Sequence, residues 1–352
     1  MRPRIVLNAL ALHASGSGVQ TYCRELLRAL PAQLDADVVA VVQERAVGEL
    51  GDGVTPLTRR DCDGVRRTLE SLRSAGPADL VHALDVDLPL RSRAATVTTV
   101  HDLSLLDEPS AFGWARRVGK QVTTRRSVRR ADAVIAVSAF TAERVRAHFK
   151  RDAHVVLEAP GPEFTPPPPA AVAAVRAKYS LPDPCVLHVG NLEPRKDIPT
   201  LASAAAAAGV PLVLAGGHIV TVDAPAGAQL LGHVAAADLP ALYAAATIVG
   251  YVSRYEGFGL PPIEAMACGA TVMATRVGAI AEVAGEGIEL VPIGDVAAQA
   301  DAIRELVNDP GRRAERQVAG LAAAGKLSWA ATARATVAIY AELGVASGSV
   351  AR

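Results

Sequence analysis

Short apolar runs alternate with amphipathic helical patterns along the chain. A strand buried on both faces is apolar throughout, and such strands alternating with helices indicate a parallel sheet covered on both sides. In the first half, strands are predicted in RIVLNAL, DVVAVVQ, ADLVHAL, ATVTTVHD and DAVIAVS, and helices in TYCRELLRALPAQL and AFTAERVRAHF.

A proline-dense segment, EAPGPEFTPPPPA at residues 158–170, interrupts this alternation. It can sustain neither a helix nor a central strand, so we interpret it as a linker between domains. A second series follows in CVLHVGN, VPLVLAGG, AQLLGHV, ATIVGYVS, ATVMATR and IELVPIG. The pattern predicts an α/β protein with two facing, doubly wound Rossmann-like domains, residues 1–163 and 164–327. Ligands are expected in a central cleft, beyond the carboxyl ends of the strands.

Composition narrows the class of protein. The 352 residues include 36 basic and 36 acidic side chains, and this neutrality argues against a general nucleic-acid binder. The four cysteines lie far apart and are interpreted as reduced, buried residues. No apolar run is long enough to span a membrane, and the apolar N-terminus is interpreted as a buried strand and not as a signal peptide. We therefore expect a cytoplasmic protein.

The most informative segment is EGFGLPPIEAMACGA, which begins at Glu256. Gly257 and Gly259 permit close approach of the backbone to a ligand, and the prolines that follow suit the first turn of a helix. The helix N-terminus favours an anion such as a diphosphate. Together with Glu256 and Glu264, this arrangement suits one ligand that carries both sugar hydroxyls and phosphates.

Three further segments, at or after the ends of predicted strands, carry candidate functional residues. In VGNLEPRKD, adjacent Arg195 and Lys196 can hold a diphosphate without a metal. In TVTTVHD, the pair His101–Asp102 could serve as a general base. The loop HASGSGVQT offers backbone donors at Gly16 and Gly18, but Thr21 occupies the third glycine position of a dinucleotide-binding fingerprint.

The segment SRYEGFGLPPIEAMACG resembles the E-x7-E signature of the retaining glycosyltransferases of group 1, family 4, which have the GT-B fold. VGNLEPRKD resembles the family's G-x-L-x-P-x-K segment, although Asn191 stands where many members have arginine. HD at 101–102 resembles the family's first-domain motif. Residues 326–344 resemble its closing helix, so residues 328–344 are expected to cross back to the first domain. The resemblance extends from about residue 5 to residue 344.

This resemblance implies a metal-independent transferase without a cofactor, which moves a hexose from a nucleoside-diphosphate sugar to an acceptor hydroxyl with retention. Members with similar HD motifs are described as mannosyltransferases, so the donor is expected to be GDP-mannose or a UDP-hexose. The implied catalytic residues are His101, Arg195, Lys196 and Glu256. The residues implied in donor binding are Gly16, Gly18, Asp102, Gly190, Val234, Gly257, Phe258, Gly259, Leu260 and Glu264.

Other interpretations stay open. A nucleotide-sugar epimerase has a similar fold and needs no acceptor, and a non-catalytic protein could keep the fold. A dinucleotide-dependent oxidoreductase is disfavoured by Thr21. Arginines and a lysine at 116–130 form either a solvated helix face or a patch for an anionic acceptor or a lipid surface. No nucleic-acid partner is expected, and the sequence does not indicate an oligomeric state.

Overall fold

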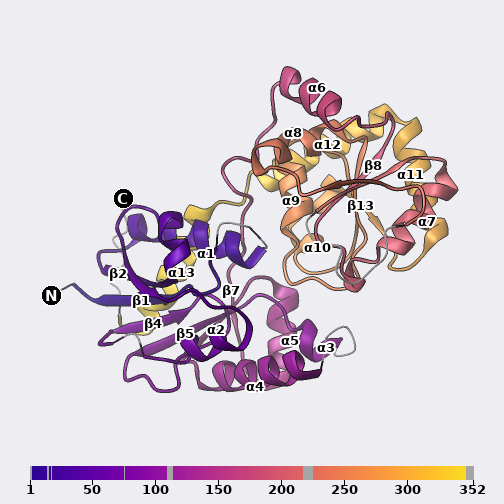
Figure 1. Ribbon diagram of the computed structural model, residues 1–352. Coiled ribbons are helices and arrows are strands. Elements are labelled where there is room, and N and C mark those ends of the chain that lie inside the picture. The colour runs from indigo at the N-terminus through magenta and orange to yellow at the C-terminus, as the bar shows by residue number, and fades with distance from the viewer. Residues whose placement is uncertain are drawn as a thin grey trace. The chain divides into compact units, whose positions relative to one another are not determined.

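The computed structural model describes residues 2–13, 16, 18–74, 76–108, 114–216 and 225–345, with the backbone alone for 114–118. The chain divides into two compact units, Met1–Glu158 with Ser328–Arg352, and Ala159–Leu327 (Figure 1). The division falls at the start of the proline-dense segment. The terminal segment belongs to the first unit, as the crossover interpretation expects.

The first unit is built on a parallel sheet whose described strands have the order β3-β2-β1-β4-β5-β6-β7. Five of these strands match the predicted apolar runs. The strands are β1 (Arg4–Asn8), β2 (Asp37–Gln43), β3 (Val54–Arg59), β4 (Leu80–Ala83), β5 (Ala95–Val100), β6 (Ala133–Ala136) and β7 (His154–Val155). The helices are α1 (Gly18–Ala29), α2 (Gly64–Ser71), α3 (Ser104–Asp107), α4 (Trp114–Arg130), α5 (Ala139–Phe149) and α13 (Trp329–Glu342).

The second unit contains a parallel sheet with the order β10-β9-β8-β11-β12-β13. All of its strands lie within predicted runs. They are β8 (Val186–Val189), β9 (Leu212–Ala215), β10 (Gln229–Gly232), β11 (Ile248–Tyr251), β12 (Val272–Thr275) and β13 (Ile288–Val291). The helices are α6 (Pro169–Lys178), α7 (Ile198–Ala208), α8 (Leu239–Ala245), α9 (Leu260–Ala267), α10 (Ile280–Val283), α11 (Val296–Asn308) and α12 (Pro310–Ala324).

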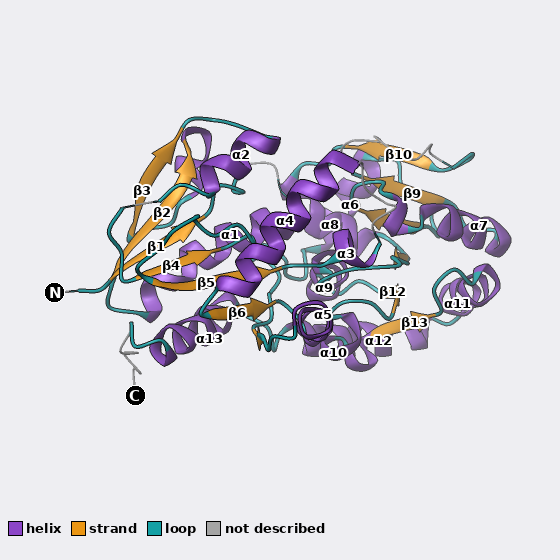
Figure 2. Ribbon diagram, turned by 90° about the horizontal axis from the view of Figure 1, so that it is seen from below, coloured by secondary structure: helices purple, strands orange, loops and turns teal. Residues whose placement is uncertain are grey.

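Apolar side chains of the strands and helices form the cores of the two units. In the second unit, α7 and α11 lie side by side next to the sheet (Figures 1 and 2). Their Leu201 and Ile303 pack with Val186 and Met273 of the strands in one fully buried cluster. Because each helix buries one apolar stripe against an apolar strand surface, the carboxyl ends of the strands are held in fixed positions.

The terminal helix α13 packs within the first unit, against α1 and the turn that follows it (Figure 1). The Tyr340 hydroxyl lies 2.6 Å from Nδ1 of His82, and both side chains are fully buried. The ring of Trp329 makes an edge contact with Tyr22, with centroids 5.9 Å apart. Trp329 and Tyr340 are therefore packing anchors, as the sequence suggested.

Candidate active site

The strand order of the second sheet reverses between the neighbouring strands β8 and β11. Two of the predicted site segments follow these two strands. Strand order runs outward from β8 through β9 to β10, and outward from β11 through β12 to β13. The crevice at such a reversal, beyond the carboxyl ends, is where doubly wound sheets bind ligands. The loop after β8 carries Arg195 and Lys196 in a short 3-10 turn, Pro194–Lys196. The loop after β11 carries Glu256 and leads into α9.

Glu256 lies between the two predicted cations. Its Oε1 accepts from Nζ of Lys196 at 2.7 Å, and its Oε2 lies 2.7 Å from Nη1 of Arg195. Nζ of Lys196 also donates to the hydroxyl of Tyr251 at 2.6 Å. Glu256 and Lys196 are only 7% and 6% exposed. The fold therefore joins the two motifs, about 60 residues apart in sequence, into one buried ion-pair cluster.

A second carboxylate and the backbone complete this cluster. Nε of Arg195 donates to Oε2 of Glu193 at 2.7 Å, and the backbone N–H of Arg254 donates to the carbonyl of Arg195 at 2.7 Å. The charges of Arg195 and Lys196 are thus matched by those of Glu193 and Glu256. A diphosphate that binds here must compete with Glu256 for the two cations.

The buried charges shift each other's protonation. Burial alone would raise the pKa of Glu256, but the charges of Lys196 and Arg195 together lower it to about 2. Burial is the main cause that lowers the pKa of Lys196. The charge of Glu256 opposes that shift, and the charge of Arg195 adds to it. Glu256 is therefore a carboxylate at neutral pH, held by the two cations.

Gly259 begins α9 in a conformation that favours glycine, with φ of 99°. A Cβ there would also lie 3.1 Å from Cγ1 of Ile280. The carbonyl of Phe258 accepts from the backbone N–H of Ala279 at 3.0 Å, which ties the loop to the segment before α10. Gly257, Phe258 and Leu260 are buried in this loop. The loop is thus fixed at the N-terminus of α9, where Leu260 and Ile263 carry the backbone N–H groups of the first turn and the two prolines between them carry none.

The remaining predicted donor-binding residues of this unit lie around the same strand ends. Glu264, in α9, is half-buried and accepts from the hydroxyl of Tyr243 at 3.1 Å. Gly190 follows β8 with φ of 147°, and Val234, which follows β10, is 6% exposed. A Cβ on Gly216, after β9, would lie 2.1 Å from the carbonyl oxygen of Gly190. Only glycine therefore fits at 216 beside the loop after β8.

His101 follows β5 in the first unit and pairs with Glu158, not with Asp102. Its Nδ1 lies 3.1 Å from Oε1 of Glu158, and its Nε2 lies 2.8 Å from the carbonyl oxygen of Leu84. Because both partners accept hydrogen bonds, both ring nitrogens donate when Glu158 is ionised, which requires an imidazolium. Burial alone would lower the pKa of His101, but the hydrogen bond and charge of Glu158 raise it above its usual value.

Asp102, Gly16 and Gly18 have different surroundings. Asp102 is exposed, and its Oδ1 accepts from the backbone N–H and the hydroxyl of Ser104, the first residue of α3, at 3.0 and 2.7 Å. Gly18 is the first residue of α1, and Gly16 is exposed before it. The structure thus gives Asp102 a local contact with Ser104, and its role in donor binding stays a prediction.

Sequence reasoning did not identify several residues that hold these side chains. Tyr251 bonds to Lys196, Tyr243 to Glu264, and Glu158 to His101. From the sequence, Tyr251 and Tyr243 are expected to be core aromatic residues, because Tyr251 lies in an apolar strand and Tyr243 in an apolar helix. Glu158 opens the segment interpreted as a linker. Its sequence carried no signal for a contact with residue 101.

The basic segment at 116–130 lies in α4, and its described side chains differ in their surroundings. Lys120 bonds to Asp85 and Asp87, and Arg126 donates to the carbonyls of Leu88 and Pro89 at 2.9 and 2.6 Å. Arg125, Arg129 and Arg130 are exposed, whereas the side chains of Arg116 and Arg117 lie outside the described residues. Among the helices described, none is long and apolar enough to cross a bilayer.

Comparisons with known proteins identify the family of the chain. Residues 174–320 match the family model "Glycosyl transferases group 1", and residues 16–159 match "Glycosyltransferase Family 4". The chain is 31% identical over 281 residues to O-antigen chain mannosyltransferase B of Escherichia coli, a match that covers 74% of each protein. It is 30% identical to the serotype-specific mannosyltransferase WbdA of Escherichia coli over 69% of this chain but only 33% of that relative.

Solved structures show the same fold. Sucrose-phosphate synthase from Thermosynechococcus elongatus aligns with a TM-score of 0.79 and 24% identity, over 97% of this chain and 99% of that one. HepE of Anabaena in complex with UDP-glucose aligns with a TM-score of 0.73 and 18% identity, over 97% and 100% of the two chains. These likenesses and the two parallel sheets confirm the predicted two-domain GT-B fold. The chain belongs to the glycosyltransferases of group 1, family 4.

Proposed function

We propose that this glycosyltransferase moves a hexose from a nucleoside-diphosphate sugar to an acceptor hydroxyl, with retention at the anomeric carbon and without a metal. The observation that carries the proposal is the buried cluster of Arg195, Lys196 and Glu256 at the strand reversal, next to the start of α9. Two cations and a helix N-terminus supply the positive charge that a departing diphosphate requires.

The pairing of Glu256 with both cations suggests how a donor is bound. The phosphates of the donor bind to Arg195 and Lys196 in place of Glu256. The carboxylate of Glu256 can then accept hydrogen bonds from the sugar hydroxyls. The backbone N–H groups from Gly257 to Leu260 face the sugar and the phosphates, and Glu264 accepts from the ribose hydroxyls. The contacts of Arg195, Lys196 and Glu264 with the donor replace contacts that these side chains make inside the ligand-free protein, so they leave little buried polar surface without a partner.

The chemical step needs no carboxylate nucleophile. The bond between the anomeric carbon and the diphosphate oxygen breaks while the acceptor oxygen attacks from the same face. The acceptor proton passes to the leaving phosphate oxygen, so proton and charge balance within the pair of substrates. Arg195 and Lys196 stabilise this step because the charge on the diphosphate grows as the bond breaks.

Similarity to the E. coli mannosyltransferases favours GDP-mannose as the donor. The UDP-glucose complex of HepE, which shares the fold at 18% identity, keeps UDP-hexoses as the second choice. The acceptor is a hydroxyl-bearing molecule, and contact of α4 with a membrane surface stays a proposal.

A thermal-shift screen with UDP, GDP, ADP and dTDP, each with and without EDTA, tests this proposal. A nucleotide at 100 times its dissociation constant stabilises the folded state by about 2.7 kcal/mol, so the donor's nucleotide should raise Tm whether or not EDTA is present. If no nucleotide raises Tm, the site does not bind a nucleotide-sugar donor. Formation of a new nucleotide sugar from donor alone would identify an epimerase. NMR of the transfer product shows whether the anomeric configuration is retained.

A further inference from the structure

A second polar cluster lies at the carboxyl ends of the strands in the first unit. The strand order of this sheet reverses between β1 and β4. Asn8 ends β1, and Asp85 and Asp87 follow β4. The amide nitrogen of Asn8 donates to the carbonyl of Asp87 at 3.0 Å and joins the two strand ends. This is the position at which doubly wound sheets bind ligands, and the donor site of the second unit does not use it.

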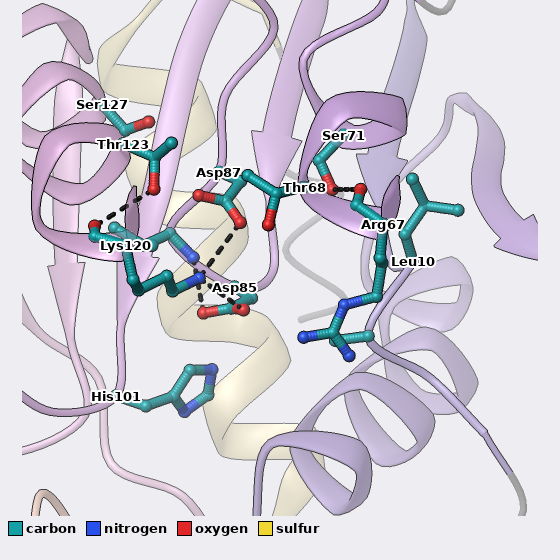
Figure 3. A network of polar contacts seen from close by, with 12 residues as sticks. Leu10, Arg67, Thr68, Ser71, Asp85, Asp87, His101, Lys120, Thr123 and Ser127 are labelled. Atoms are coloured by element: carbon teal, nitrogen blue, oxygen red, sulfur yellow. Dashed lines mark hydrogen bonds and ion pairs between the residues drawn. The ribbon is translucent and has the colours of Figure 1, made fainter. Parts of the chain in front are cut away.

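Lys120 of α4 holds the two carboxylates together. Its Nζ lies 3.0 Å from Oδ2 of Asp85 and 3.0 Å from Oδ2 of Asp87 (Figure 3). Burial alone would lower the pKa of Lys120, but the two carboxylates raise it above its usual value. The ammonium of Lys120 therefore lies between the two carboxylates. The Asp85 side chain remains 27% exposed.

Arg67 of α2 faces this cluster from the side opposite Lys120. Figure 3 shows its guanidinium directed toward Asp85, and no hydrogen bond or ion pair joins it to the residues drawn there. A small pocket lies here, with a volume of about 10 Å³. That volume admits about one water-sized group. The pocket is lined by Asn8, Leu10, Ala11, Arg67, Ser71, Asp85 and Asp87.

We propose that this pocket receives a single hydroxyl group of the acceptor, which donates to the carboxylate of Asp85 and accepts from the guanidinium of Arg67. The acceptor is accordingly a neutral sugar or another polyol at this position. This inference rests on the proposed transferase function and adds to it the chemical class of the second substrate.

Charge and size favour a hydroxyl over an anion. A hydroxyl is both donor and acceptor, so one group satisfies a carboxylate and a guanidinium at once. Asp85 and Asp87 carry two negative charges, which Lys120 and Arg67 balance. The imidazolium of His101, whose charge also acts on Asp85, is paired with Glu158, so the pocket has no surplus positive charge for a phosphate. A phosphate also needs more room than one water-sized group. Approach of a dianion to two carboxylates would be repulsive.

Saturation-transfer NMR with methyl α-D-mannopyranoside and with myo-inositol tests the inference on the full-length protein. We expect transfer to one or both probes in the wild type, unchanged by added GDP or UDP. Arg67→Met and Asp85→Asn should weaken probe binding about tenfold or more, because each removes a hydrogen bond to a charged group. Arg66→Met is the matched control, since Arg66 is exposed on the same helix and does not line the pocket.

The outcomes separate this inference from the transferase proposal. The nucleotide thermal shift is measured on the same samples, and it should be the same in Arg67→Met as in the wild type. If neither polyol shows saturation transfer, or if Arg67→Met binds the probe as well as Arg66→Met, the pocket is not an acceptor site even though nucleotides bind. Displacement of the probe by inorganic phosphate would also overturn the inference, because the ligand would then be an anion. Asp85→Asn counts only if its Tm shows that it folds.

Discussion

Lys196 and Glu264 have different surroundings, so their loss should affect different steps. Lys196 is buried against Glu256 and has the charge to stabilise the leaving diphosphate. Glu264 is half-buried and accepts a hydrogen bond from the hydroxyl of Tyr243. We expect Lys196→Ala to lower kcat on the order of 100-fold, the usual effect of losing one such stabilising group. Glu264→Ala should chiefly weaken nucleotide binding, measured by calorimetry with the nucleotide that the thermal screen identifies.

Lys178→Ala is the control for the lysine substitution. Lys178 pairs with Asp238 on the surface at 2.6 Å, and surface pairs contribute little to stability. Its kcat and Tm should stay close to those of the wild type. Wild-type transfer rates in both Lys196→Ala and Glu264→Ala would show that the roles assigned to these residues are wrong.

The pairing of His101 with Glu158 predicts a dependence of stability on pH. The pKa of His101 is raised on folding above its ordinary value of 6.5. The stabilising contribution is therefore fully present below about pH 6.5 and is lost as the pH rises through the folded-state pKa. Urea denaturation at a series of pH values should show this loss in the wild type and a smaller one in Glu158→Gln. Equal pH profiles for the two proteins would contradict the imidazolium assignment.

At the scale of residues, the sequence predicted which groups carry the chemistry, but it did not predict which residues hold those groups in place. Glu256, Arg195 and Lys196 were predicted from the spacing of their motifs and from the family resemblance. Their mutual pairing was not predicted, because it joins segments about 60 residues apart. The same holds for His101 and Glu158, which are 57 residues apart. Local patterns do not specify contacts between residues so far apart, so only the fold shows that Glu256 pairs with both cations.

Strands that contain a run of apolar residues were predicted well, including the partly exposed β10, whereas the exposed strands β3 and β7 were missed. The apolar runs correspond to β1, β2, β4, β5, β6 and all strands of the second sheet. The edge strand β3 was missed, because its residues Val54–Arg59 are half-buried or exposed and include Pro56. A proline is tolerated only at such an edge. The two-residue strand β7 (His154–Val155) is exposed and too short to produce a pattern.

The contact between the loops after β8 and β9 predicts the effect of a single methyl group. A Cβ on Gly216 would lie 2.1 Å from the carbonyl oxygen of Gly190, and this oxygen belongs to the backbone, which cannot move away cheaply. Gly216→Ala should lower the free energy of unfolding by about 1–3 kcal/mol, as overpacking does, and weaken nucleotide binding. Urea denaturation and calorimetry measure the two effects.

Gly48→Ala is the control, because a Cβ there meets no atom within 4 Å. Its stability should lie within about 0.5 kcal/mol of the wild type. A Gly216→Ala protein as stable as Gly48→Ala would mean that the two loops do not approach each other as the structure has them.

At the scale of the whole molecule, the chain returns to its first unit at the end. The resemblance to the family predicted this return, and the division of the chain assigns Ser328–Arg352 to the first unit. Periodicity alone could not predict it, because a helical pattern does not specify which of two sheets it covers. Burial does so here. Tyr340 is fully enclosed and bonded to His82, which in turn lies 2.8 Å from Thr99.

This connectivity predicts that fragments of the chain differ in their ability to fold. Residues 159–327 contain a complete sheet with its helices and should unfold cooperatively as a separate protein. Residues 1–158 lack α13, so Tyr22 and His82 lose the cover of Trp329 and Tyr340, and a buried histidine loses a hydrogen-bond partner. We expect this fragment to melt at a lower temperature than the same fragment joined through a Gly-Ser linker to residues 328–345. Circular dichroism at 222 nm follows both transitions. Equal melting temperatures would show that α13 does not stabilise the first unit.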